Sequence, residues 1–193
     1  MRLVLAALVG ILCAALLLPA AMPVPRPAPD FIIHFKDGTE IPLKSFRGKV
    51  IALTFVHTTC PHCQHASQVF SKLFDEYGAR GFQPLGVAFN PMANLYVDDF
   101  VRTYGIKYPV GFSADIPVLD FLGISAMERY VVPQIVWIDR KGNIRSQTPP
   151  LGEEKLLQEP YWREMIETLL KEPAEGAKKP TATHATHAAK KSP

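Results

Sequence analysis

The stretch Val50-Ile51-Ala52-Leu53-Thr54-Phe55-Val56-His57-Thr58-Thr59-Cys60-Pro61-His62-Cys63 decides the fold. Its first half is a continuous apolar, β-branched run, which is typical of a strand buried on both faces. Beyond it, apolar residues recur at helical spacing and form one stripe of an amphipathic helix: Ala66, Val69, Phe70, Leu73, Phe74 and Tyr77. Pro61 fits the first helical turn, where its missing N–H is not needed. The sequence therefore predicts a buried strand that leads directly into a long helix, with two cysteines at the junction.

The rest of the central region alternates between strand and helix patterns. Residues 31–35 and 40–43 flank the turn Lys36-Asp37-Gly38-Thr39 and predict a hairpin. The remaining predicted strands cover 82–89, 108–112, 134–139 and 144–146, and the remaining predicted helices cover 94–104, 116–122 and 161–171. This alternation indicates an α/β fold class.

The composition divides the chain of 193 residues into four parts. Residues 1–22 hold Arg2 and an apolar run over 3–18, which indicates a signal peptide or a membrane anchor. Residues 23–30 are predicted to be a Pro-rich linker, 31–172 the folded domain, and 173–193 a disordered low-complexity tail. We therefore expect an extracytoplasmic protein, either secreted or anchored to the cytoplasmic membrane through residues 3–18. The net charge of +3 carries no basic stripe, so nucleic acid is not expected as a partner.

The pair Cys60 and Cys63 is the candidate redox centre. A third cysteine, Cys13, lies in the apolar N-terminal run, which leaves one close pair in the exported portion. A lone pair in an oxidising compartment is more often reactive than structural. The N-terminus of a helix favours a thiolate, which is the nucleophile of disulfide exchange. We therefore predict that Cys60 attacks and that Cys63, facing inward three residues later, resolves the mixed disulfide.

Pro61 and His62 are predicted to tune this pair. The helix dipole supplies at most ~2 kcal/mol, or roughly 1.5 pKa units. A deeper depression of a cysteine pKa needs a further donor or charge, and His62 lies between the two cysteines. A more stable thiolate makes the disulfide more oxidising, which predicts an oxidising or isomerising bias and a reduction potential above ~−270 mV.

The domain resembles the thioredoxin superfamily and, within it, the TlpA/ResA branch of extracytoplasmic redoxins. The resemblance covers about 31–170 and includes residues 55–63, 104–110 and 132–144, with the pattern Pro-x-x-x-Ile-Asp-x-x-Gly starting at Pro133. It implies a thioredoxin-like fold, a central mixed sheet flanked by helices and an N-terminal β-hairpin. It also implies a cis proline at Pro133, a substrate site lined by Val132, Pro133 and Thr59, no cofactor beyond the Cys60–Cys63 disulfide, and no metal. The implied partners are protein thiols and disulfides and a membrane or extracytoplasmic redox partner.

Two departures from this family leave the direction of electron flow open. Thr59 stands where the family usually carries tryptophan, and Ala66-Ser67-Gln68 stands where many members carry a glutamate. The Pro61-His62 dipeptide instead resembles that of DsbA-type oxidases.

A second function class also stays open, a copper or zinc chaperone or assembly module on the same fold. His57, His62 and His65 crowd the cysteine motif, although a closed zinc site needs four ligands. Leu53 and His57 stand where a peroxiredoxin needs proline and threonine, which excludes that class.

Overall fold

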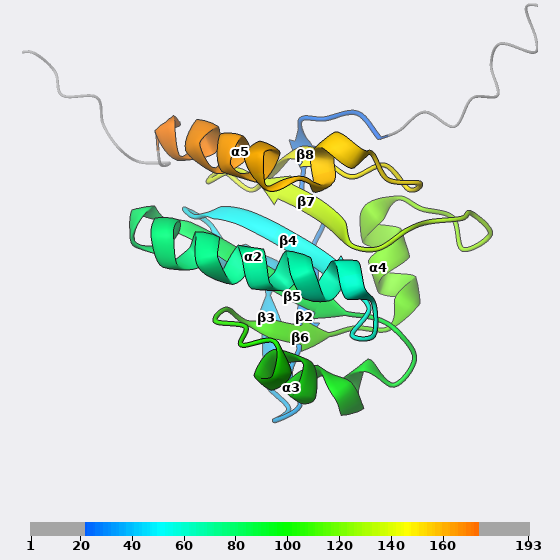
Figure 1. Ribbon diagram of the computed structural model, residues 1–193. Coiled ribbons are helices and arrows are strands. Elements are labelled where there is room, and N and C mark those ends of the chain that lie inside the picture. The colour runs from blue at the N-terminus through cyan, green and yellow to red at the C-terminus, as the bar shows by residue number, and fades with distance from the viewer. Residues whose placement is uncertain (1–21, 174–193) are drawn as a thin grey trace, which may run out of the picture.

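The computed structural model describes residues 22–173, which form one sheet with helices on both faces (Figure 1). The strands are β1 (Arg26–Pro27), β2 (Ile32–His34), β3 (Glu40–Pro42), β4 (Val50–Val56), β5 (Phe82–Ala88), β6 (Val110–Phe112), β7 (Gln134–Ile138) and β8 (Asn143–Gln147). The helices are α2 (Pro61–Tyr77), α3 (Ala93–Thr103), α4 (Asp115–Leu122) and α5 (Glu159–Lys171). Short 3₁₀ turns cover Leu43–Phe46, Gly78–Arg80 and Glu154–Leu157.

The sheet is mixed and has the strand order β1-β8-β7-β4-β5-β6-β2-β3. Strands β4, β5 and β6 run parallel to one another. On one side β7 pairs antiparallel with β4 and β8 with β7, and on the other side the antiparallel β2–β3 hairpin pairs antiparallel with β6. The predicted α/β class, with a central mixed sheet, flanking helices and an N-terminal hairpin, is confirmed.

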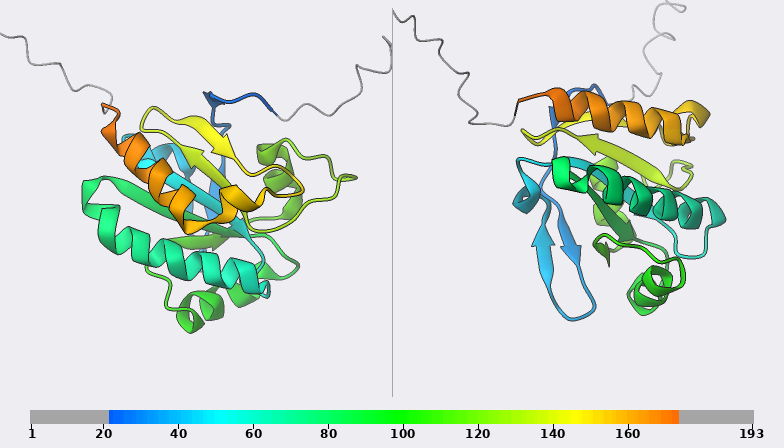
Figure 2. Two further views of the ribbon diagram at one scale, coloured as in Figure 1. Left: turned by 45° about the horizontal axis from the view of Figure 1, so that its top comes forward. Right: turned by 60° about the vertical axis from the view of Figure 1, so that its left-hand side comes forward.

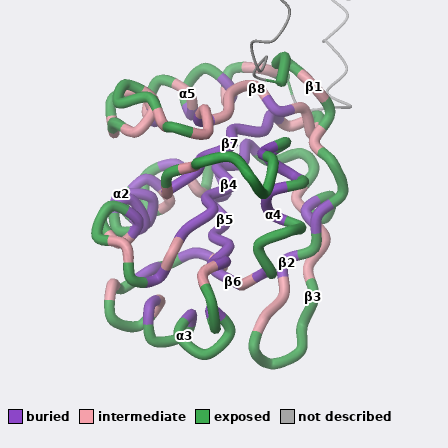
Figure 3. The backbone as a smooth tube through the Cα atoms, turned by 90° about the vertical axis from the view of Figure 1, so that its right-hand side faces the viewer, coloured by how far each residue is buried: buried purple, intermediate pink, exposed green. Residues whose placement is uncertain are grey.

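Strand β4 lies at the centre of the sheet and is buried along its whole length (Figure 3). Alternate residues of a strand point to opposite faces, and both faces of β4 are covered. Val50, Ala52 and Val56 belong to the core beneath α2, α3 and α5. Ile51, Leu53 and Phe55 belong to the core shared with α4 and the hairpin. Figures 1 and 2 show α2 and α5 side by side on one face, with α4 on the other.

The segment expected to be a spacer, residues 23–30, differs in part from that prediction. Arg26 and Pro27 form β1 and pair with Ile144 and Asn143 at the edge of the sheet. The Arg26 guanidinium donates to Gln147 Oε1 at 2.8 Å. Proline-rich chain is already extended, and an edge strand tolerates the missing N–H of Pro27, so the same composition suits this pairing.

Two predicted segments lie outside the described residues: almost all of the signal peptide or anchor, with Cys13, and the tail from residue 174 onward. Within residues 22–173, no helix has both the length and the apolar character that crossing a membrane requires.

Candidate active site

The loop between β4 and α2 carries the cysteine pair and is closed by its own backbone. The N–H of Cys60 donates to the carbonyl of His57 at 3.1 Å, and the N–H of Gln64 donates to the carbonyl of Cys60 at 3.0 Å. Cys60 is the residue that caps α2, and Pro61 is the first residue of the helix. The backbone thus places the Cys60 side chain at the open N-terminal end of α2, as the sequence predicts.

Two side chains outside the cysteine motif hold this loop in place. Asn90, two residues after the end of β5, accepts from the N–H of Thr58 at 2.9 Å and from its hydroxyl at 3.3 Å. Gln64 donates from Nε2 to the carbonyl of Thr58 at 3.0 Å. The sequence analysis did not single out either residue. The position of Asn90 just after a predicted strand was the signal that could have identified it, because the carboxyl ends of the parallel strands β4 and β5 meet at one edge of the sheet.

The two cysteines differ in burial. Cys60 is partly buried and Cys63 is fully buried, and both are free thiols. Burial raises the pKa of Cys63 far above its usual value, and the neighbouring Cys60 adds to this, whereas the backbone N–H of His57 acts in the opposite direction. Cys63 therefore stays protonated and out of reach of an external partner, while Cys60 faces outward.

The loop before β7 lies against the Cys60 sulfur. Cys60 Sγ is 3.8 Å from the carbonyl oxygen of Val132, a residue 72 positions away in the sequence. The Val132–Pro133 peptide bond is cis, and Pro133 is buried while Val132 is half-buried. Tertiary folding thus brings together three of the residues that the sequence analysis singled out.

A buried amide supports this loop from behind. Gln134 is fully buried, and its Nε2 donates to the carbonyls of Val131 at 2.8 Å, Pro150 at 3.2 Å and Pro149 at 3.3 Å. Since Gln134 follows Pro133 directly, these bonds fix the backbone that faces Cys60.

The other predicted site residues lie on the exposed rim. Thr59, Pro61 and His62 are all exposed beside the half-buried Cys60. Their side chains are accessible to a macromolecule that approaches the Cys60 sulfur.

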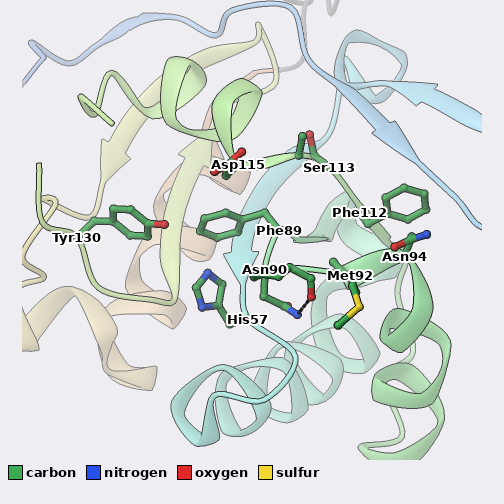
Figure 4. A pocket seen from close by; sticks show the side chains of 12 residues that line it. His57, Phe89, Asn90, Met92, Asn94, Phe112, Ser113, Asp115 and Tyr130 are labelled. Atoms are coloured by element: carbon green, nitrogen blue, oxygen red, sulfur yellow. Dashed lines mark hydrogen bonds between the residues drawn. The ribbon is translucent and has the colours of Figure 1, made fainter. Parts of the chain in front are cut away.

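A hollow of about 510 Å³ opens beside the redox loop (Figure 4). The rings of His57 and Phe89 meet edge to face at 4.6 Å, and Phe89 lies 6.0 Å from the ring of Tyr130. Met92 and Asp115 line the hollow as well. Burial lowers the pKa of His57, so its imidazole is neutral at neutral pH.

A second hollow, of about 380 Å³, lies against Thr58, Thr59 and Gln64 and reaches Tyr96 on α3. The loop from His57 to Thr59 therefore contributes walls to two depressions in the surface.

Neither the cysteines nor the three motif histidines gather into a metal site, because residues 22–173 contain no group of three or more His, Cys, Asp or Glu side chains able to hold an ion.

Comparison with known proteins places this geometry in a family. A model described as the AhpC/TSA family matches residues 24–147, which include β1, the redox loop and the Pro133 loop. The chain belongs to the AhpC/TSA family. Within this family, its likeness is to redoxins of the thioredoxin type, as the resemblance to the TlpA/ResA branch implied.

Relatives of known class are similar over most of the domain. The thiol-disulfide oxidoreductase ResA of Bacillus thuringiensis (strain Al Hakam) is 26% identical over 133 residues, which cover 69% of this chain and 72% of the relative. The ResA of Halalkalibacterium halodurans is 30% identical over 117 residues, which cover 61% of this chain and 63% of the relative. A crystal structure of a thiol:disulfide interchange protein of the thioredoxin family from Chlorobium tepidum TLS superimposes with a TM-score of 0.62 at 25% identity, and the match covers 78% of this chain and 99% of that one. This AhpC/TSA family member is therefore a thioredoxin-like thiol–disulfide oxidoreductase.

Proposed function

We propose that the protein exchanges a Cys60–Cys63 disulfide with the thiols and disulfides of extracytoplasmic proteins through a mixed disulfide on Cys60. The observation that carries this proposal is the placement of the Cys60 sulfur, half-exposed and 3.8 Å from the Val132 carbonyl, in front of the fully buried Cys63. The Cys60 sulfur is accessible to a partner protein, whereas the Cys63 sulfur is accessible only to Cys60.

The reaction consists of two consecutive thiol–disulfide exchange steps. The Cys60 thiolate attacks one sulfur of a substrate disulfide, a substrate thiolate leaves, and a mixed disulfide forms. Cys63 then loses its proton and attacks the Cys60 sulfur, so that the Cys60–Cys63 bond forms while the second substrate sulfur leaves as a thiolate and is protonated. Two electrons pass from the dithiol to the substrate. The same steps in reverse oxidise a substrate dithiol.

The surface around Cys60 supports a polypeptide as the substrate. Val131 exposes 39% of its surface, and Val132 is half-buried, so the backbone on the open side of the Pro133 loop is accessible to an extended chain. Thr59 lies on the same rim. A substrate side chain next to the reacting cysteine would enter the hollow lined by Phe89, Tyr130 and Met92, which favours apolar or aromatic residues at that position.

A Cys63→Ala variant tests this function, because it removes the thiol that releases the mixed disulfide. With a peptide that contains one intramolecular disulfide as the probe, this variant should accumulate a covalent adduct on Cys60 that reducing agent removes. The Cys60→Ser variant should form no adduct and show no turnover, although it retains the buried thiol. Exchange that persists in Cys60→Ser would refute the assignment.

The direction of exchange in the cell is tested by the reduction potential. The exposed His62 beside Cys60 supports an oxidising or isomerising bias, and we expect a potential above ~−270 mV. Equilibration of the Cys60–Cys63 pair with glutathione buffers measures it. A His62→Gln variant should shift the potential toward more reducing values, whereas His65→Gln, an exposed histidine on the same helix, should not.

The extracytoplasmic location rests on Arg2 and the apolar run over residues 3–18. To test this location, whole cells that express the full chain are treated with a membrane-impermeant phosphine, which reduces an accessible Cys60–Cys63 disulfide, and then with a membrane-impermeant maleimide. Cys60 should be labelled without lysis, whereas labelling that requires lysis contradicts the proposed compartment.

A further inference from the structure

The hollow of about 510 Å³ beside the redox loop is connected to the reacting sulfur through two segments that line it. His57 lines the hollow, and its carbonyl accepts from the N–H of Cys60 at 3.1 Å. Tyr130 lines it as well and lies two residues before Val132, whose carbonyl is 3.8 Å from the Cys60 sulfur. A polypeptide held at Cys60 therefore has this hollow next to it, and its volume is in the usual range of ligand pockets, ~300–1,000 Å³.

Aromatic rings form much of the wall of this hollow. Phe89 is 4% exposed, and its ring meets that of His57 edge to face at 4.6 Å and lies 6.0 Å from that of Tyr130. In Figure 4, these rings lie together, and Met92 lies on the side away from Tyr130. Aromatic pairs attract beyond the area that they bury, at ring separations of ~4.5–7 Å. This wall therefore favours a further ring over an aliphatic side chain of similar size.

Met92 borders the hollow in a backbone conformation that is unfavourable for its type of side chain. Its φ is 57° and its ψ is 28°, and it is the only non-glycine residue with a positive φ among residues 22–173. The N–H of Ala93 donates to the carbonyl of Asn90 at 3.0 Å, and the N–H of Leu95 donates to the carbonyl of Met92 at 2.9 Å. Glycine adopts this left-handed conformation without strain, so a methionine at this position calls for an explanation.

The Met92 side chain is free to contact a bound group. It is 59% exposed and lines the hollow. A methionine side chain is flexible, adapts to the shape of its neighbours and makes favourable contacts between its sulfur and aromatic rings. A ring that enters the hollow would also cover apolar surface of Met92 that now faces water. The side chain is therefore suited to close over an aromatic group.

The charge at the hollow favours an uncharged occupant over an acidic one. Asp115 is exposed at the start of α4 and lines the hollow, and its Oδ1 accepts from the N–H of Ile116 at 2.8 Å. No lysine or arginine of residues 22–173 lines the hollow. An acidic side chain would leave water for an aromatic wall that offers it a like charge and no cation.

We propose that this hollow is the subsite for an aromatic side chain next to the reacting cysteine of the substrate polypeptide, and that Met92 determines this specificity. The inference rests on the proposed function and narrows its substrates to polypeptides that carry Phe, Tyr or Trp beside the cysteine. The substrate ring packs beside Phe89, and Met92 closes over it while the substrate sulfur meets Cys60. Met92 contributes to binding of the substrate and takes no part in the exchange of sulfur bonds.

The rate at which Cys60 attacks a set of blocked peptides tests this subsite. The probes have the form Ala-X-Cys-X-Ala, with the cysteine blocked as a disulfide with 2-nitro-5-thiobenzoate and with X as Phe, Leu, Ala or Glu. Attack of Cys60 on the peptide sulfur breaks this disulfide, releases the coloured thiolate and forms the mixed disulfide. At low peptide concentration, the second-order rate constant should fall in the order Phe, Leu, Ala, Glu. The Phe peptide should react about tenfold faster than the Ala peptide.

Substitutions of Met92 test its part in this preference. In Met92→Ala, the ratio of the rate constants of the Phe and Ala peptides should fall about fivefold, because the contact between sulfur and ring is lost. Met92→Leu keeps an apolar side chain of similar size and should keep most of the ratio. Leu95→Ala is the matched control, because Leu95 is 54% exposed on α3 and is not among the residues that line the hollow. It should leave the ratio unchanged.

A Met92→Gly variant separates recognition from folding. Its ratio should be as low as that of Met92→Ala, whereas its thermal midpoint should lie above that of Met92→Ala, because glycine adopts a positive φ without strain. A wild-type ratio in Met92→Ala overturns the role of Met92, and a wild-type protein that attacks the Ala or Glu peptide as fast as the Phe peptide overturns the aromatic subsite. Absence of coloured thiolate from every peptide overturns the proposed function instead, so these failures are distinguishable.

Discussion

Replacement of Asn90 by alanine should loosen the redox loop, because Asn90 is the side chain that ties this loop to the end of β5. Its Oδ1 accepts from the N–H of Thr58 at 2.9 Å and from the Thr58 hydroxyl at 3.3 Å. Thr58 is 6% exposed, so water cannot readily replace the lost acceptor. Leaving a buried donor unpaired costs ~1–3 kcal/mol. For a domain of this size, a loss of about 2 kcal/mol lowers the thermal midpoint by about 4–8 °C.

Two further variants separate the lost acceptor from other effects of the substitution. Asn90→Asp keeps an oxygen that can accept from Thr58 and should restore most of the midpoint at neutral pH, where the carboxylate is ionised. Asn94→Ala removes an exposed asparagine that lines the same hollow and should leave the midpoint unchanged. Calorimetry of the reduced full-length proteins measures all three, and peptide disulfide exchange should slow in Asn90→Ala alone. A midpoint for Asn90→Ala equal to that of Asn94→Ala refutes the anchoring role.

Three other perturbations follow from the same structure. Gln134→Leu should lower the free energy of unfolding in urea by about 1–2 kcal/mol, because three carbonyls behind the Pro133 loop lose their shared donor, whereas exposed Gln68→Leu should not. Burial raises the pKa of Cys63 above its unfolded value of ~8.5, so its contribution to the stability of the reduced protein is fully present below that pH and is lost as pH rises further. The decline of stability at alkaline pH should therefore be shallower in Cys63→Ala, and an equal slope contradicts the shift. In Gly111→Ala, the added Cβ would meet the carbonyl of His34 and the side chain of Ile33, which weakens the pairing of the hairpin with β6. The free energy of unfolding in urea should therefore fall by ~1–3 kcal/mol. A variant as stable as the wild type contradicts this contact.

Much of the fold follows from local patterns along the chain. The apolar run at 50–56 and the helical stripe from Ala66 to Tyr77 predict β4 and α2 within a few residues, because strand and helix periods differ and both elements are long. The pairing of β1 with β8 was not predicted, because proline-rich chain is extended whether or not it finds a partner, and its partner lies more than a hundred residues away. A contact between segments so far apart in the sequence does not show in the local pattern of residues.

The active site divides in the same way. Cys60, Cys63 and their junction between strand and helix are local features, and the sequence alone determined them, together with the chemistry that a thiolate at a helix N-terminus supports. Tertiary structure alone decided which sulfur is accessible, that the Val132 carbonyl lies 3.8 Å from it, and that Asn90 anchors the loop. These features depend on burial and on contacts between distant segments, and both arise only when the strands and helices pack together.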